Sequence, residues 1–200
     1  MPGLLESSAM LLTLACVYLA VRRNIWTYPT GIVATTLYFF LFISVSIPLA
    51  VLQLVFNVDQ LYGWWFWLYG DKGKAPPIQR LGLAKTLICG ALAAVGGYIF
   101  GGYMNQYPSA MMGPLDTSIA ISSLLAQFFL DRKKIENWVL WLIVNLVSVY
   151  FYWTVGLIPT AILYVILWFN AFYGYREWKR ELELGPVGTQ ANAAFVEQSA

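Results

Sequence analysis

Seven long, mostly apolar stretches constrain what this chain can fold into more than any other feature of its sequence. They cover approximately residues 4–21, 25–44, 47–69, 82–103, 115–130, 138–154 and 157–175. A helix needs about 20 predominantly apolar residues to cross the hydrocarbon core of a bilayer. Composition agrees, since 60% of the residues are hydrophobic and only 11% are charged, whereas soluble domains carry about 25% charged residues. We therefore expect an all-α integral membrane protein with seven transmembrane helices in a lipid bilayer.

The basic residues predict how these helices are oriented. All 12 fall in or beside the connections that follow the first, third and fifth stretches, or after the seventh: Arg22, Arg23, Lys72, Lys74, Arg80, Lys85, Arg132, Lys133, Lys134, Arg176, Lys179 and Arg180. Cytoplasmic loops carry the excess of Lys and Arg in membrane proteins. The N-terminus is therefore predicted to lie outside and the C-terminus in the cytoplasm.

Part of the chain repeats. A shift of 111 residues aligns 47–67 with 158–178, so that an Ile-Pro pair and a Tyr-Gly-xxx-Trp motif recur in both copies. Leu and Ala matches arise easily by chance in an apolar sequence, but these matches do not. Because one helix separates the copies, they have the same orientation, as in the SWEET plan of parallel repeats. We expect a 3+1+3 arrangement: a first three-helix bundle (1–81), a linker transmembrane helix with an outer loop (82–114), a second three-helix bundle (115–178) and a disordered cytoplasmic tail (179–200).

Polar and aromatic side chains recur along single faces of four helices. The candidate substrate-binding residues are Gln53, Asn57, Gln60, Trp64, Gln127, Trp141, Asn145, Tyr152 and Asn170. Polar residues in membrane helices either join helices by hydrogen bonds or line a cavity. For each residue alone the helix-joining role stays open, but four helices that carry such side chains favour a substrate cavity between the two bundles.

The chemistry of this set indicates a class of ligand. Carboxamides donate and accept hydrogen bonds, while indole and phenol rings stack on planar heterocycles and attract cations. The set contains no Arg or Lys to neutralise a phosphate. The predicted ligand is an unphosphorylated planar heterocycle, neutral or cationic. Of the two carboxylates in these helices, Asp116 fits a helix cap, whereas Asp59 could join helices, reach the membrane surface or bind a proton.

An enzyme is not expected. The chain has no histidine and its two cysteines lie in separate apolar stretches. It also lacks an HExxH motif and a Walker loop. We therefore predict no catalytic residues, no cofactor, no metal and no nucleic-acid partner. A membrane sensor is the alternative outside transport, although such a protein would more naturally carry a cytoplasmic domain.

Three stretches carry a resemblance to a known family. They are QLVFNVDQLYGWWFW (53–67), SLLAQFFLDRKKIENWVLWLIVN (123–145) and the segment 158–178 that ends in YGYREW. Over about residues 10–180 the chain resembles the PnuC-type vitamin transporters of bacteria. The resemblance implies facilitated diffusion of an unphosphorylated vitamin precursor across the bacterial inner membrane, usually nicotinamide riboside. It also implies a homotrimer, and trapping of the substrate by a cytoplasmic kinase.

The substrate is left open at this point. Relatives in this family carry thiamine or riboflavin-type compounds, and thiamine is also a cationic heterocycle. The chemistry of the polar faces therefore does not separate thiamine from nicotinamide riboside.

Overall fold

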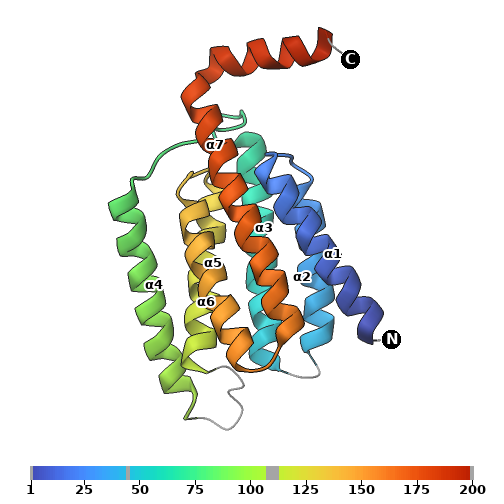
Figure 1. Ribbon diagram of the computed structural model, residues 1–200, viewed down its shortest axis with the longest axis vertical. Helices are drawn as coiled ribbons and strands as arrows, with labels where there is room; N and C mark the ends of the chain where they lie inside the picture. The colour runs from blue at the N-terminus through green and yellow to red at the C-terminus, as the bar shows by residue number, and fades with distance from the viewer. Residues whose placement is uncertain (1, 44–45, 107–112, 199–200) are drawn as a thin grey trace.

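The chain forms a bundle of long helices that run side by side (Figure 1). The computed structural model describes residues 2–43, 46–106 and 113–198. The helices in these ranges are α1 (Pro2–Val21), α2 (Thr27–Phe42), α3 (Ile47–Tyr69), α4 (Leu83–Met104), α5 (Pro114–Asp131), α6 (Asn137–Thr154) and α7 (Ile158–Gln198). Each coincides with one of the seven apolar stretches, so the prediction of an all-α protein with seven helices is confirmed.

Four of these helices are long and apolar enough to cross a membrane: α1, α4, α6 and α7. The other three fall short for identifiable reasons. Helix α2 has only 16 residues, whereas α3 and α5 carry carboxamide and carboxylate side chains that lower their hydropathy. Polar side chains inside a membrane are tolerated where they face other protein elements rather than lipid. Helix α3 packs against α2 and α5, and α5 packs against α3, α4 and α6, so the polar side chains of both helices can face protein.

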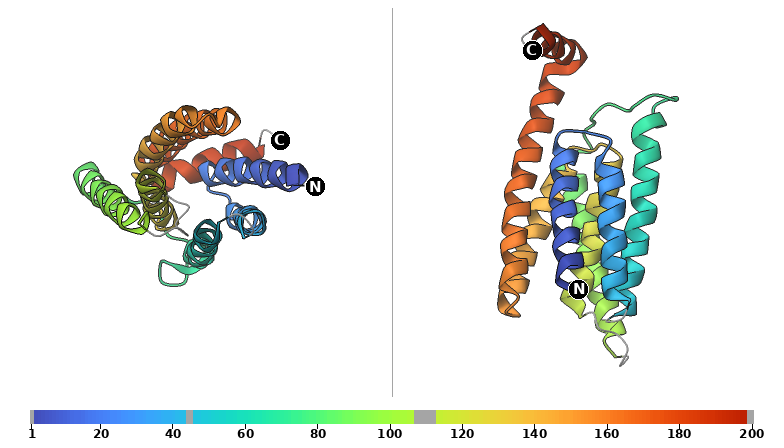
Figure 2. Two further views of the ribbon diagram at one scale, coloured as in Figure 1. Left: turned by 90° about the horizontal axis from the view of Figure 1, so that it is seen from below. Right: turned by 90° about the vertical axis from the view of Figure 1, so that its right-hand side faces the viewer.

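Six of the helices form a closed ring. Helix α1 packs on α2, α2 on α3, α3 on α5, α5 on α6, α6 on α7, and α7 returns to α1. Helix α4 lies outside this ring, mainly along α5 (Figure 2). A ring has an inner face, which polar side chains can use, and an outer face, which lipid can cover.

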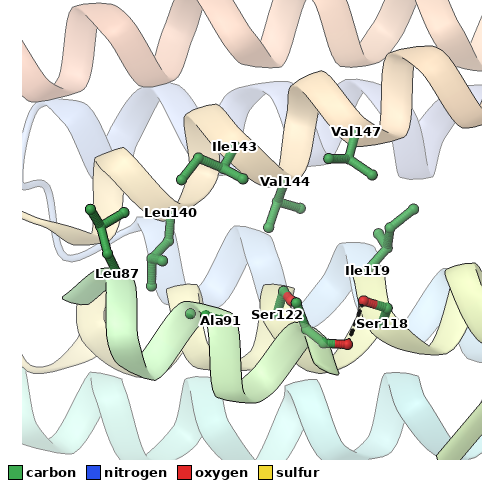
Figure 3. Close-up of a pocket in the computed structure, with 11 residues that line it drawn as sticks. Leu87, Ala91, Ser118, Ile119, Ser122, Leu140, Ile143, Val144 and Val147 are labelled. Atoms are coloured by element: carbon green, nitrogen blue, oxygen red, sulfur yellow. Dashed lines mark hydrogen bonds between the residues drawn. The ribbon is translucent and has the colours of Figure 1, made fainter. Parts of the chain in front are cut away.

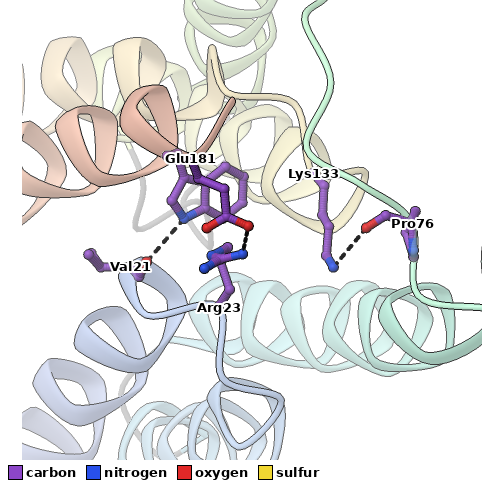
Figure 4. Close-up of polar contacts among 6 residues, drawn as sticks. Val21, Arg23, Pro76, Lys133 and Glu181 are labelled. Carbon is purple, nitrogen blue, oxygen red and sulfur yellow. Dashed lines mark hydrogen bonds and ion pairs between the residues drawn. The ribbon is translucent and has the colours of Figure 1, made fainter. Parts of the chain in front are cut away.

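The turns that follow α1 and α5 have the same backbone form. Arg23 and Lys133 both have positive φ, 54° and 50°, a left-handed conformation that commonly ends helices. Their backbone N–H groups donate to Ala20 at 3.0 Å and to Leu130 at 2.9 Å. Arg23 forms an ion pair with Glu181 (Figure 4). Burial, together with the nearby Arg23, lowers the pKa of Lys133 to about 8.

Two tryptophans close the ring at the end where these turns lie. The indole N–H of Trp67 on α3 donates to the backbone carbonyl of Leu130 on α5, at 3.3 Å. The indole N–H of Trp178 on α7 donates to the carbonyl of Val21 on α1, at 3.1 Å (Figure 4). The Val21 carbonyl lies at the end of α1, where helix carbonyls lose their partners within the helix, and the Leu130 carbonyl near the end of α5 gains the indole as a partner in addition to the backbone N–H of Lys133.

The same two indoles form the centre of the hydrophobic core. Tyr28 packs edge-on against Trp67, with ring centroids 5.2 Å apart and planes at 85°. Trp138 packs in the same way against Trp178, at 5.5 Å and 87°. Edge-to-face pairs are a favoured aromatic geometry. All four rings are almost fully buried, so this end of the bundle is closely packed.

A buried glutamate fixes the entry to α4. Glu136, 6% exposed, accepts hydrogen bonds from the backbone N–H groups of Leu81 and Gly82 at 2.9 and 3.0 Å. We expect Glu136→Ala to lower the stability of the protein in detergent by about 1–3 kcal/mol, because a buried charge-assisted network loses its acceptor. Thermal unfolding followed by tryptophan fluorescence would measure this. The exposed Glu183→Ala is the control, and equal melting temperatures for both variants would contradict the assignment.

Helix α7 is longer than the sequence predicts. Residues 179–200 are expected to be a disordered tail, yet α7 continues to Gln198, and its end bends away from the bundle (Figure 1). Lys179 and Glu183 form an ion pair one turn apart at 3.7 Å. A polar helix lacks the apolar stripe that reveals a helix in a sequence. Residues 199–200 of the predicted tail, and 107–112 of the predicted outer loop, lie outside the described residues.

Candidate functional site

Helix α6 presents two buried polar atoms that have no protein partner. Asn145 is 3% exposed and Ser148 is fully buried, and neither the Asn145 Oδ1 atom nor the Ser148 Oγ atom accepts or donates a hydrogen bond. Each such atom costs about 1–3 kcal/mol when it is left unpaired. Unpaired buried groups in a native structure call for an explanation, and a bound ligand is one.

An aromatic platform lies on the same stripe of α6. Tyr152 stacks against Tyr164 of α7, with ring centroids 5.2 Å apart and planes only 13° from parallel. The Tyr164 hydroxyl lies close enough to Ser148 for the two hydroxyl groups to interact, so the Asn145 Oδ1 atom is the one on this face that depends on a ligand for a partner. Asn145, Ser148 and Tyr152 follow one another at i, i+3 and i+7, which places them on one helical face. Flat rings next to unpaired acceptors suit a planar molecule with polar substituents.

The amides of α3 are used differently, because they join α3 to α2. Asn57 donates to Thr36 Oγ1 at 3.3 Å and accepts a short hydrogen bond from Thr35. Gln60 donates to Thr35 Oγ1 at 3.3 Å. Gly31 lies under Gln60, where a Cβ atom would overlap the amide oxygen. For Asn57 and Gln60, this geometry favours the helix-joining role over a substrate contact.

Of four other predicted site residues, one joins two helices and three are partly buried. Asn170 donates to the carbonyl of Val17 at 3.4 Å and so joins α7 to α1. Trp64 and Trp141 are partly buried and pack against the hydrophobic core. Gln53 is half-buried in the first half of α3. The structure therefore brings Asn145 and Tyr152 together on α6, while Asn57, Gln60 and Asn170 bond to neighbouring helices.

One buried residue was missed by the sequence reading. Asp131 stands in the charged run Asp-Arg-Lys-Lys, which reads as a solvated loop, but its side chain is fully buried. Gln127 donates to Asp131 Oδ1 at 3.0 Å, and so does the Tyr28 hydroxyl, also at 3.0 Å. The i, i+4 spacing from Gln127 is the signal that could have placed Asp131 on the inner face of α5.

The other carboxylate near α5 behaves as the sequence predicts. Asp116 Oδ2 accepts a hydrogen bond from the backbone N–H of Gly113 at 3.2 Å, at the start of α5. This is the bond that a residue in the first turn of a helix makes to the preceding cap. The prediction that Asp116 stabilises the start of α5 is confirmed, although Gly113 and not Asp116 stands at the N-cap position.

A separate apolar pocket lies outside the ring, between α4, α5 and α6 (Figure 3). Its volume is about 290 Å³, and its lining is mostly aliphatic, with Ser118 and Ser122 as its hydroxyl groups. Ser118 already donates to the carbonyl of Ala94 at 2.8 Å. None of the predicted site residues lines it. A polar heterocycle would find few hydrogen-bond partners there, so this pocket does not suit the predicted ligand.

Metal-binding side chains do not cluster among the residues that the structure describes. Within residues 2–43, 46–106 and 113–198, no group of three or more His, Cys, Asp or Glu side chains could hold a metal ion. The polar groups on α6 are an amide and a hydroxyl, which bind organic ligands through hydrogen bonds.

Comparison with known proteins identifies the family. The model of a family described as "Nicotinamide mononucleotide transporter" matches residues 3–180. The riboflavin/roseoflavin transporter RibM of Streptomyces davaonensis is 30% identical over 172 residues, which cover 84% of this chain and 79% of RibM. The nicotinamide riboside transporter PnuC of Escherichia coli is 25% identical over 202 residues, which cover 87% of this chain and 84% of that protein.

A solved structure shares the fold. The crystal structure of the vitamin B3 transporter PnuC matches with a TM-score of 0.71 and 21% identity, covering 89% of this chain and 81% of that one. The resemblance found in the three sequence stretches is thereby confirmed, and it extends over most of the chain. The chain belongs to the nicotinamide mononucleotide transporter family, the family of PnuC, and is a multi-pass transporter of the bacterial inner membrane and not an enzyme.

Proposed function

We propose that this chain carries nicotinamide riboside into the cell by facilitated diffusion. The observation that carries the proposal is the buried, unpartnered Oδ1 atom of Asn145, on the same helical face as Tyr152, which stacks on Tyr164. The riboside offers what these groups lack, because it has a carboxamide, ribose hydroxyls and a planar cationic ring. Cations are attracted to aromatic faces. The name of the Escherichia coli relative supports the same substrate.

Riboflavin is the second candidate. The specific observation in its favour is that RibM, a riboflavin/roseoflavin transporter, is 30% identical to this chain over 172 residues, against 25% over 202 residues for the Escherichia coli PnuC. Riboflavin is also planar and carries polar groups, but its ring is uncharged and larger. Thiamine, a cationic heterocycle, belongs in the same panel.

We further propose that the ring consists of two parallel three-helix groups. The first group comprises α1–α3 within residues 1–81, the second comprises α5–α7 within 115–178, and the segment 82–114 links them. The matching turns at Arg23 and Lys133 support this, and so do the matching bonds of Trp67 and Trp178. Transport then proceeds by one group rocking against the other, with the substrate held between them.

The orientation, the assembly and the driving force complete the proposal. The turns after α1 and α5 carry basic residues, and this end of the bundle faces the cytoplasm by the positive-inside rule. The N-terminus is then outside. Homotrimeric assembly, and a cytoplasmic kinase that phosphorylates the imported riboside, follow from the family resemblance. A phosphorylated product could not leave through a site without cationic side chains.

Equilibrium binding to the purified protein tests the substrate. Nicotinamide riboside, riboflavin and thiamine are titrated side by side, with nicotinamide mononucleotide as the phosphorylated control. We expect saturable binding of the riboside and no binding of its phosphate. Saturable binding of riboflavin alone would establish the second candidate. If none of the three binds to protein that unfolds cooperatively, the proposed site on α6 is wrong.

A further inference from the structure

A pair of buried carboxyl groups lies between α3 and α5. Asp131 of α5 is fully buried; its Oδ1 atom accepts two hydrogen bonds, but its Oδ2 atom has no partner. Asp59 of α3 approaches Asp131 closely enough for the two side chains to hydrogen-bond. The Asp59 Oδ2 atom is also buried and has no partner. Two carboxyl groups can hydrogen-bond to each other only if one of them carries a proton.

The backbone of α3 is shaped to admit this contact. Gly63 lies one turn after Asp59, on the same face of α3. A Cβ atom at position 63 would overlap the carboxyl group of Asp131, and would lie 2.6 Å from the ring of Tyr28. The absence of a side chain at Gly63 therefore lets the Asp131 carboxyl reach α3 beside Asp59.

The charged and titratable groups around the pair leave it without a cation. The described residues form two ion pairs, Arg23–Glu181 and Lys179–Glu183, and neither involves Asp59 or Asp131. The groups that face the pair from α1 and α2 are the thiol of Cys16 and the hydroxyl of Tyr28. Both are neutral in the physiological range.

The basic residues that follow Asp131 in the sequence are directed elsewhere. Arg132 donates to the Tyr62 hydroxyl at 2.6 Å and lies 4.8 Å from the centre of the Phe66 ring. Lys133 donates to the carbonyl of Pro76 at 2.9 Å (Figure 4). Two negative charges without a cation in a water-poor site repel each other strongly. One shared proton removes that repulsion and gives a partner to an otherwise unpaired oxygen.

The second joint of the ring shows that packing does not require these carboxyls. With the two three-helix groups taken as repeats, as proposed above, the shift of 111 residues pairs Asn170 with Asp59, and the matching turns at Arg23 and Lys133 pair Val21 with Asp131. The joint between α7 and α1 closes with the Asn170 amide on the carbonyl of Val17 and with an apolar Val21. Corresponding positions in the two joints therefore carry no charge at the α7–α1 joint and two carboxyl groups at the α3–α5 joint. Ionisable groups buried at membrane depth are costly and usually functional.

We propose that Asp59 and Asp131 form a proton-binding site that ties the two three-helix groups together. With one proton bound, the pair shares it in a hydrogen bond between α3 and α5. When that proton leaves to water, two carboxylates remain, and their repulsion separates α3 from α5 at the end where the basic turns lie. The site takes a proton whatever vitamin the chain carries, so it does not depend on the identity of the substrate.

Infrared spectroscopy of the purified wild-type protein tests the bound proton directly. The protein is labelled with ¹³C in its aspartate carboxyl groups and titrated from acid to alkaline pH. We expect a band from a protonated aspartate at neutral pH that disappears at higher pH, equivalent to one proton per chain. Asp131→Asn and Asp59→Asn should each remove it, whereas the control Asp116→Asn should retain it. If the wild-type protein shows no such band at neutral pH, the proposal is overturned, whether or not the variants fold.

A distance measurement tests the tie between the helices. Spin labels are placed at Leu68 on α3 and Phe128 on α5, both of which are exposed. We expect the distance distribution to widen over the pH range in which the infrared band disappears. In Asp131→Asn the new amide can donate to Asp59, so the distribution should stay narrow at every pH. A band that titrates while the wild-type distances stay constant would refute the coupling to helix separation.

Discussion

Replacing Asn145 by leucine is expected to lower uptake of the vitamin at least tenfold, with little change in the amount of folded protein. The two side chains are similar in size, and the amide oxygen of Asn145 has no partner inside the protein. Removing an unpaired buried polar group costs the folded protein little and can stabilise it. The substrate, in contrast, loses a hydrogen-bond partner in a site without water. A tenfold loss corresponds to about 1.4 kcal/mol.

The matched control for this prediction is Asn57→Leu. The Asn57 amide is bonded to Thr35 and Thr36, so this variant should lose thermal stability while the protein that remains folded keeps its substrate affinity. Uptake into proteoliposomes and equilibrium binding, both normalised to folded protein, measure the two effects. If Asn145→Leu transports like the wild type while Asn57→Leu loses binding, the substrate site lies on α3 and not on α6.

A large loss of stability is expected from adding one methyl group, in Gly174→Ala. A Cβ atom at position 174 would lie 2.7 Å from three atoms of the Trp138 indole, which is 1% exposed. The indole cannot move away, because it also packs against Trp178. Overpacking of a core costs about 1–3 kcal/mol. The variant should melt at a clearly lower temperature in detergent and reach the membrane in smaller amounts.

Another helical glycine provides the control, because alanine at that position should not lower the melting temperature. Gly96 lies in α4, and a Cβ atom there would meet nothing within 4 Å. Because alanine favours helices over glycine by about 0.5–1 kcal/mol, Gly96→Ala should leave the melting temperature unchanged or raise it. Thermal unfolding of the two variants under the same conditions gives the comparison. A wild-type melting temperature for Gly174→Ala would mean that the core around Trp138 is loosely packed.

The helices could be predicted from the sequence because lipid leaves few alternatives. A run of about 20 apolar residues in a bilayer must satisfy its backbone internally, and a helix does this. Helix α3 begins at Ile47 and ends at Tyr69, the bounds that the apolar run predicts. The cap role of Asp116 also follows from local sequence, because the residues that define it lie within one turn.

The candidate site could be predicted only in part, because a sequence gives the spacing of polar residues but not their neighbours. Asn57 and Asn145 look alike in the sequence, since each lies in a polar stripe of an apolar helix. In the structure the first amide bonds to threonines of α2, and the second has an unpaired oxygen. Asp131 was missed because its neighbours are basic. Which charges are buried depends on helix packing, and helix packing is not a local property.

The two bonds from Trp67 and Trp178 lie at the same end of the ring, and this has a consequence for the cell's energy supply. Helices that are joined at one end of a bundle can separate only at the opposite end. In the orientation proposed above, and while the Asp59–Asp131 pair holds its proton, a transporter that is fastened in this way at its cytoplasmic end can fill from outside without offering an open channel through the membrane. The closed end of the bundle then blocks protons and sodium ions, which are far smaller than a vitamin. The bacterium could keep such a protein in its inner membrane without discharging the potential that drives its ATP synthesis.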